Sequence, residues 1–142
     1  MNAIKQLSIF LENKPGMIRR VCEVLHREQI SILTMTLADT AQFGILRFLV
    51  RETKEAKEAL EKAGLTITET DVLALPVANV PGGLAALLKV IDEAELNVEY
   101  MYAFTFGQGR DAVMIFRFKD VEAALAAFEK AGIRTIDPTA LD

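Results

Sequence analysis

Two short Asn-x-Pro-Gly segments carry the residue types best suited to binding a small molecule. The first is Asn13-Lys14-Pro15-Gly16, and the second, Asn79-Val80-Pro81-Gly82, follows 66 residues later. Each precedes an amphipathic stretch, so each should form the turn before a helix, where unpaired N–H groups and a partial positive charge favour a carboxylate. An asparagine amide both donates and accepts, as an amino acid's ammonium and carboxylate require. Ordinary turn formation is the alternative explanation of both segments.

A second pair of matching segments indicates that the chain is duplicated. Glu61-Lys62-Ala63-Gly64-Leu65 recurs as Glu129-Lys130-Ala131-Gly132-Ile133, at an offset of 68. Two landmarks at nearly one spacing predict a repeated unit of roughly seventy residues. We therefore expect two domains, 1–69 and 70–142, and any binding site should come in related pairs.

Hydrophobic periodicity gives both copies the order β-α-β-β-α-β. In the first copy the strands are expected at 4–11, 30–38, 45–50 and 65–75, with one helix that has Pro15 in its first turn and another around 56–63. In the second copy the strands are expected at 72–78, 98–106, 113–118 and 133–136, with helices around 84–91 and 121–128 and a turn at 107–110. This is the α+β, ferredoxin-like arrangement, an antiparallel sheet with both helices on one face.

The hairpin strands are apolar on both faces. Ile45 and Leu49 alternate with Leu46 and Phe48, and strand 113–118 shows the same pattern. A sheet covered on only one face would expose the other set, which usually marks an interface. We expect sheet contacts between copies, between chains or both, and contacts between chains would give a homodimer.

Composition excludes several classes of protein. A net charge of −4 over 142 residues gives no electrostatic footprint for nucleic acid. No apolar run reaches the roughly 18 residues of a membrane span, and the first residues lack a signal-peptide pattern, so we expect a cytoplasmic protein. The chain has one histidine, His26, which we expect at a solvated helix end, and one cysteine, Cys22, which we expect in the core. With so few such residues we expect no metal site, no cofactor and no catalytic constellation.

The duplicated order resembles the ACT domain family. The resemblance rests on four segments, two loops and the openings of the two second strands: Asn13-Lys14-Pro15-Gly16-Met17, Asn79-Val80-Pro81-Gly82-Gly83, Ile30-Ser31-Ile32 and Leu96-Asn97-Val98. It covers essentially the whole chain, one domain per copy. It implies a tandem pair of small regulatory modules that bind amino acids at interfaces between paired domains.

The resemblance also implies site residues. In the family, the asparagine and glycine of the loop and the start of the second strand line the effector pocket. The matching positions are Asn13, Gly16 and Ser31 in the first copy and Asn79, Gly82 and Asn97 in the second, flanked by Lys14, Met17, Val80, Pro81 and Gly83.

The two copies depart from the family pattern to different degrees. Ser31 replaces an asparagine often found there, and Leu11 and Val77 stand where some members have a polar residue. The second copy keeps both asparagines, so we favour its loop. A pocket that combines one copy's loop with the other copy's strand is the alternative.

The strand that follows Asn97 contains two further candidates. Glu99 has the charge to meet an ammonium group, and Tyr100 has the ring to form a pocket wall. The alternative is that alternating side chains merely cover one sheet face: Val98, Tyr100, Tyr102 and Phe104.

The expected function is a non-catalytic regulatory module that binds a free amino acid at an ACT domain interface. The regulated partner, an enzyme or a transcription factor, is not named by the residues. A structural or dimerising module without ligand is the first alternative. An RNA-binding domain of the same topology is the second, and the acidic balance argues against it.

Overall fold

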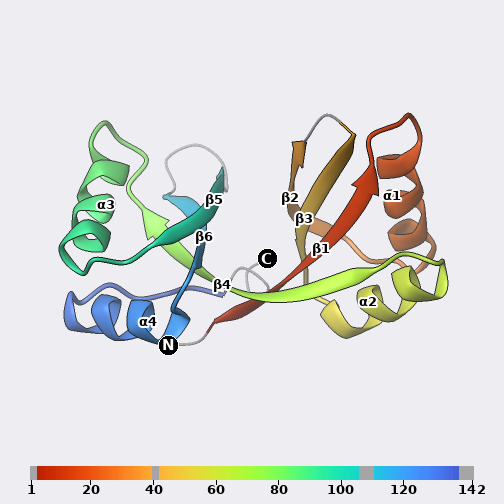
Figure 1. Ribbon diagram of the computed structural model, residues 1–142. Helices are drawn as coiled ribbons and strands as arrows, with labels where there is room; N and C mark the ends of the chain where they lie inside the picture. The colour runs from red at the N-terminus through yellow and green to blue at the C-terminus, as the bar shows by residue number, and fades with distance from the viewer. Residues whose placement is uncertain (1–2, 40–41, 106–110, 138–142) are drawn as a thin grey trace. The chain divides into compact units, whose positions relative to one another are not determined.

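The computed structural model describes residues 3–39, 42–105 and 111–137 (Figure 1). The first repeat supplies five elements, in the predicted order: β1 (Ile4–Glu12), α1 (Met17–Arg27), β2 (Ile32–Asp39), β3 (Phe43–Val50) and α2 (Thr53–Lys62). The second repeat supplies four more: α3 (Gly83–Glu93), β5 (Val98–Thr105), β6 (Ala112–Phe118) and α4 (Val121–Lys130).

One long strand, β4 (Ile67–Val77), serves both repeats. This sharing agrees with the overlap of the two strands expected there, at 65–75 in the first copy and 72–78 in the second. The described residues divide into a first unit, residues 5–70, and a second unit, residues 3–4 with 71–137. The division therefore falls inside β4. The assignment of 1–69 and 70–142 as separate domains stays a prediction.

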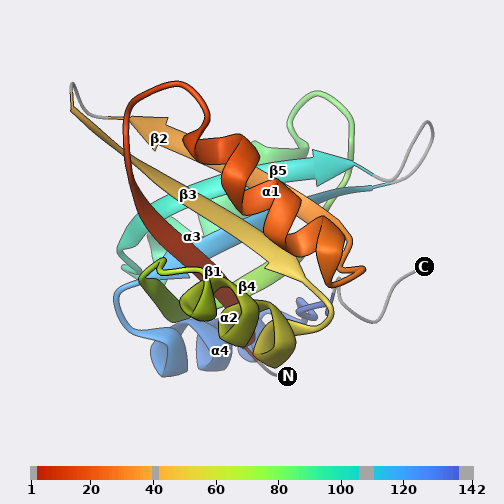
Figure 2. The same cartoon turned by 90° about the vertical axis from the view of Figure 1, so that its right-hand side faces the viewer.

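Hydrogen-bonded neighbours follow the order β2-β3-β1-β4-β6-β5. In the first unit β3 pairs antiparallel with both β1 and β2, and in the second unit β6 pairs antiparallel with both β4 and β5. The predicted α+β fold, two βαββαβ repeats with antiparallel strands, is confirmed. In the first unit α1 and α2 lie on the same side of the sheet (Figure 2).

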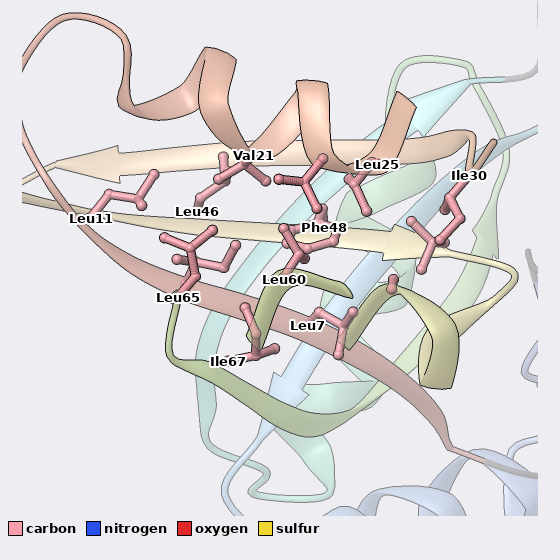
Figure 3. Packing of buried hydrophobic residues seen from close by; sticks show 14 residues of the cluster. Leu7, Leu11, Val21, Leu25, Ile30, Leu46, Phe48, Leu60, Leu65 and Ile67 are labelled. Atoms are coloured by element: carbon pink, nitrogen blue, oxygen red, sulfur yellow. The ribbon is translucent and has the colours of Figure 1, made fainter. Parts of the chain in front are cut away.

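The first unit has its own hydrophobic core between helices and sheet (Figure 3). Alternate residues of β1 and β3 point into it, because side chains of a strand alternate between faces. Helices α1 and α2 contribute buried residues at helical spacing to the same core. The largest members are Leu7, Ile9, Leu25, Leu46, Phe48 and Leu60.

The second unit repeats this construction with larger rings. Phe116, Phe118 and Phe128 are buried, with centroids 5.4 Å apart for the first pair and 5.7 Å for Phe118 and Phe128. The predicted stripe of α3 reaches the same core through Leu87 and Ile91, flanked by partly buried leucines. Each unit therefore buries the apolar face that its periodicity predicted.

Three local predictions were wrong. Pro15 lies in the turn before α1 rather than in its first helical turn. The helical spacing of Ile18, Val21 and Leu25 predicts one apolar stripe, but Ile18 is 39% exposed, whereas Val21 and Leu25 are buried. The expected strand at 133–136 is reduced to one bridge, in which the Ile136 N–H donates to the Ala74 carbonyl at 2.9 Å. The turn predicted at 107–110 lies outside the described residues.

Candidate functional site

The two Asn-x-Pro-Gly loops have nearly the same backbone conformation. Each ends in a glycine at the N-cap of the following helix, with φ 90° and ψ −13° at Gly16 and φ 87° and ψ −9° at Gly82. A positive φ of this size is rare for residues with a Cβ, which accounts for glycine at both positions. The two loops thus keep one backbone geometry although their sequences differ.

The hydrogen bonds of the two loops also correspond. The N–H of Lys14 donates to the Glu12 carbonyl at 3.0 Å, and the N–H of Val80 donates to the Ala78 carbonyl at 2.9 Å. One turn later, the Gly16 and Gly82 carbonyls each accept a first helical bond at 3.0 Å. The loops are therefore equivalent in bonding as well as in torsion angles.

The helices that follow the loops begin without side-chain caps. In the described residues, no side chain accepts a hydrogen bond at the N-cap of α1 or α3, and neither first turn contains an acidic residue. By contrast, Asp120 caps α4, accepting the Ala123 N–H at 3.0 Å. The N-termini of α1 and α3 keep their partial positive charge, which suits an anionic group such as a carboxylate.

Space at the loops is open at two glycines and closed at a third. A Cβ added to Gly16 or Gly82 would meet no described heavy atom within 4 Å. A Cβ on Gly83 would lie 2.0 Å from the Ala78 carbonyl oxygen. Glycine is thus required at position 83 because the Ala78 backbone lies too close for a side chain. The sequence predicted Gly83 only as a ligand contact and did not predict this packing role.

The predicted second-strand residues lie far from the loops of their own copies. Ser31 and Asn97 follow the C-terminal ends of α1 and α3, whereas the loops precede the N-terminal ends. Each helix has 11 residues and is therefore about 16 Å long. Within one unit, the structure does not bring Asn13 together with Ser31, or Asn79 together with Asn97.

Asn97 borders a hollow of about 710 Å³ in the second unit, and Asn79 does not line it. Asp71, Lys119 and Asp120 also line this hollow. The Asn97 carbonyl accepts the Lys119 N–H at 3.1 Å. The backbone of Asn97 therefore helps to fix the end of β6, while its side chain is on an exposed residue.

Comparison with known proteins decides the family. The sequence profile of the ACT domain pair matches residues 2–135. The chain belongs to the ACT domain family. A crystal structure of BT0572 from Bacteroides thetaiotaomicron is 33% identical, with a TM-score of 0.90, and the match covers 96% of this chain and 94% of that one.

More distant structures share the fold of this ACT pair. The regulatory subunit of aspartate kinase from Thermus thermophilus, in its ligand-free form, is 19% identical with a TM-score of 0.63, over 92% of each chain. The corresponding subunit from Thermus flavus is 17% identical with a TM-score of 0.61, over 93% of this chain and 97% of that one. The comparison with curated proteins found no significant match.

In the second ACT unit, Glu99 is engaged within the protein. Its Oε1 lies 3.3 Å from Nε of Arg117, whose Nη1 donates to the Asp71 carbonyl at 2.9 Å. The pairing of β5 with β6 shifts register between Val98 and Tyr100, and a shift at the same place in β2 falls between Ile32 and Thr34. Sequence reasoning missed Arg117, because only the register places it beside Glu99.

The same register shift corrects the predicted face of β5. Tyr100 pairs with Arg117, and Tyr102 with Ile115, on the sheet face away from the core. Val98 instead pairs with the buried Phe118 and packs against the core. A bulge moves successive side chains to different faces, so Val98 does not share a face with the tyrosines.

The two residues with the most reactive side chains have ordinary surroundings in this ACT pair. His26 is exposed in the last turn of α1, as predicted, beside a hollow of about 500 Å³. Cys22 is only half-buried and lies outside the core cluster, so its predicted core role was wrong. Among the described residues, no group of three or more His, Cys, Asp or Glu could hold a metal ion. No described helix is both long and apolar enough to cross a membrane.

Proposed function

We propose that this ACT pair is a non-catalytic regulatory module that binds a free amino acid at its strand-to-helix loops. The equivalence of the two loops carries the proposal. Both retain a left-handed glycine, an uncapped helix N-terminus and open space, although their sequences have diverged. Those features suit an amino acid's carboxylate.

Family membership supports a regulatory role. Two structures with the same fold are named as regulatory subunits of aspartate kinase. Their sequence identity to this chain is below 20%. The likeness therefore supports a regulatory role but does not identify the enzyme that is regulated. The homodimer expected from the apolar strands is part of this proposal.

The proposed mechanism is a shift of population. An amino acid that binds one conformation better than another favours that conformation by its difference in binding free energy. Asn13 and Asn79 supply amide groups next to the two helix N-termini. Their amides can hold the ammonium group while helix N–H groups bind the carboxylate.

A thermal-shift screen against the twenty amino acids tests the proposal. A true effector at about 100-fold over its Kd stabilises the folded chain by about 2.7 kcal/mol. At this chain length that corresponds to a rise in Tm of roughly 5–10 °C. If a folded sample shows no shift with any of the twenty, the module binds no amino acid and the structural, dimerising role takes its place. A mobility assay with RNA at low salt tests the remaining alternative separately.

A further inference from the structure

An aromatic pair stands exposed on the first unit. Phe10 and Phe43 stack with ring centroids 4.9 Å apart and an interplanar angle of 19°. Phe10 is 62% exposed and Phe43 is 37% exposed. Phe10 alternates along β1 with the buried Ile9 and Leu11, so the pair lies on the sheet face away from α1 and α2.

The register places this pair next to the first loop. Phe43 pairs directly with Glu12, the last residue of β1. The following N–H, that of Asn13, donates to the Gln42 carbonyl at 2.9 Å. The aromatic rings and the Asn13 loop are thus at the same end of the first unit.

An ion pair borders the rings. Glu12 lies two residues after Phe10 and directly opposite Phe43, so its side chain shares their face. Its Oε2 lies 3.3 Å from Nζ of Lys14, and the two side chains are 62% and 58% exposed. An exposed pair of this kind contributes little to stability. One ammonium, one carboxylate and one apolar surface therefore meet at a single place.

The second unit forms an equivalent loop without any of these groups. The positions that correspond to Phe10, Glu12 and Lys14 are Pro76, Ala78 and Val80, and Phe43 corresponds to Asp111. The loop conformation is nevertheless the same. The fold of the loop does not require the aromatic pair or the ion pair, and both lie at the surface, where a ligand can reach them.

The geometry points to an amino acid with an aromatic or large apolar side chain as the ligand, bound at this aromatic pair in the first unit. Beside the α1 N-terminus and the Asn13 amide, Lys14 adds a cation for the ligand carboxylate and Glu12 an anion for its ammonium, and the Phe10 and Phe43 rings contact its side chain. This inference rests on the proposed function, because it names the ligand class and the copy that binds it. It moves the preferred site from the second copy, which the sequence favoured, to the first.

Calorimetric titration of the full chain with chosen probes tests this assignment. L-phenylalanine and L-leucine should bind at least about tenfold more tightly than L-serine, because only the first two bury apolar surface on the rings. 3-Phenylpropanoate lacks the ammonium and 2-phenylethylamine lacks the carboxylate. Each should lose at least about tenfold relative to L-phenylalanine, since each lacks one of the two charged groups that the site binds.

Variants locate the site. Phe10→Ala and Lys14→Gln should each weaken L-phenylalanine binding by about tenfold or more. Leu37→Ala is the matched control, because Leu37 is 45% exposed on β2 but pairs with Leu46 on the core face. It should leave binding unchanged. Circular dichroism checks that each variant is folded, and the analogue series on the unaltered chain needs no variant.

The outcomes separate this inference from the proposed function. If polar amino acids bind and L-phenylalanine and L-leucine do not, the ligand class is wrong and amino-acid binding stands. If L-phenylalanine binds equally well to Phe10→Ala and to the unaltered chain, the location is wrong. If no amino acid binds, both this inference and the proposed function are overturned.

Discussion

Gly16 and Gly82 have φ angles of 90° and 87° and occupy the same place in two loops whose other residues differ. Each is the N-cap of its helix, and a Cβ added to either glycine would meet no described heavy atom within 4 Å. A conformation that only glycine adopts readily has been kept twice. The loop backbone is therefore the conserved part of the duplication, and the side chains around it are where the copies diverge.

The neighbouring glycines Gly82 and Gly83 should respond differently to alanine. Gly82→Ala meets no neighbour and should cost about 1–2 kcal/mol for its left-handed backbone. Gly83→Ala places a Cβ 2.0 Å from a backbone oxygen that cannot rotate away, so its cost in unfolding free energy should be greater. Urea denaturation of both variants provides the comparison. Equal costs would contradict the close approach of Gly83 to Ala78.

The Asp120 cap should matter to α4. Its carboxylate accepts the Ala123 N–H at 3.0 Å, so Asp120→Ala should lower the free energy of unfolding by about 1 kcal/mol. Asp120→Asn keeps an acceptor oxygen and serves as the control, with most of the stability retained. A loss as large for asparagine as for alanine would mean that the cap contributes through charge rather than through the hydrogen bond.

Glu99 and Arg117 should be coupled, but weakly. Their side chains are 46% and 27% exposed, so solvent screens the pair and its coupling should be about 0.5–1 kcal/mol. A double-mutant cycle with Glu99→Gln and Arg117→Leu, leucine being the residue at the matching position of β3, measures this energy. The coupling should shrink in high salt. A coupling near zero at low salt would show that Arg117 acts mainly through the Asp71 carbonyl.

Sequence periodicity was sufficient for the fold because each helix buries one regular face, while β4 and β6 show the consecutive apolar residues of strands buried on both faces. The shared strand, the four helices and the glycine stops at Gly64 and Gly132 all follow from local patterns. The failures have local causes too. A bulge between Val98 and Tyr100 breaks the alternation on which the predicted face depended. The last predicted strand, at 133–136, is only one bridge between Ala74 and Ile136 in the structure.

The proposed binding residues were less predictable than the fold. The loop positions follow from the repeated motif, but the pairing of Phe10 with Phe43 depends on strand register. One signal was present in the sequence. Phe10 interrupts the polar face of β1, between the inward-facing Ile9 and Leu11. A large ring on the side of a strand opposite its core face indicates a contact that the core itself does not use.

The two loop asparagines should differ in their effect on ligand binding. If the first copy holds the effector, Asn13→Ala should reduce the thermal shift by the equivalent of about a tenfold loss in affinity, since a hydrogen bond to a charged group is worth about 1.5–3 kcal/mol. Asn79→Ala then serves as the comparison. A shift abolished by Asn79→Ala and kept by Asn13→Ala would return the site to the second copy.

A residue-resolved NMR titration tests the central claim most directly. Amide resonances of the uniformly labelled chain are followed while each of the twenty amino acids is added in turn. We expect at least one amino acid to cause saturable shifts that are largest at the amides of the first turns of α1 or α3, immediately after Gly16 or Gly82. If all twenty leave both helix N-termini unchanged, or if saturable shifts appear only elsewhere, binding of a free amino acid at the strand-to-helix loops is contradicted.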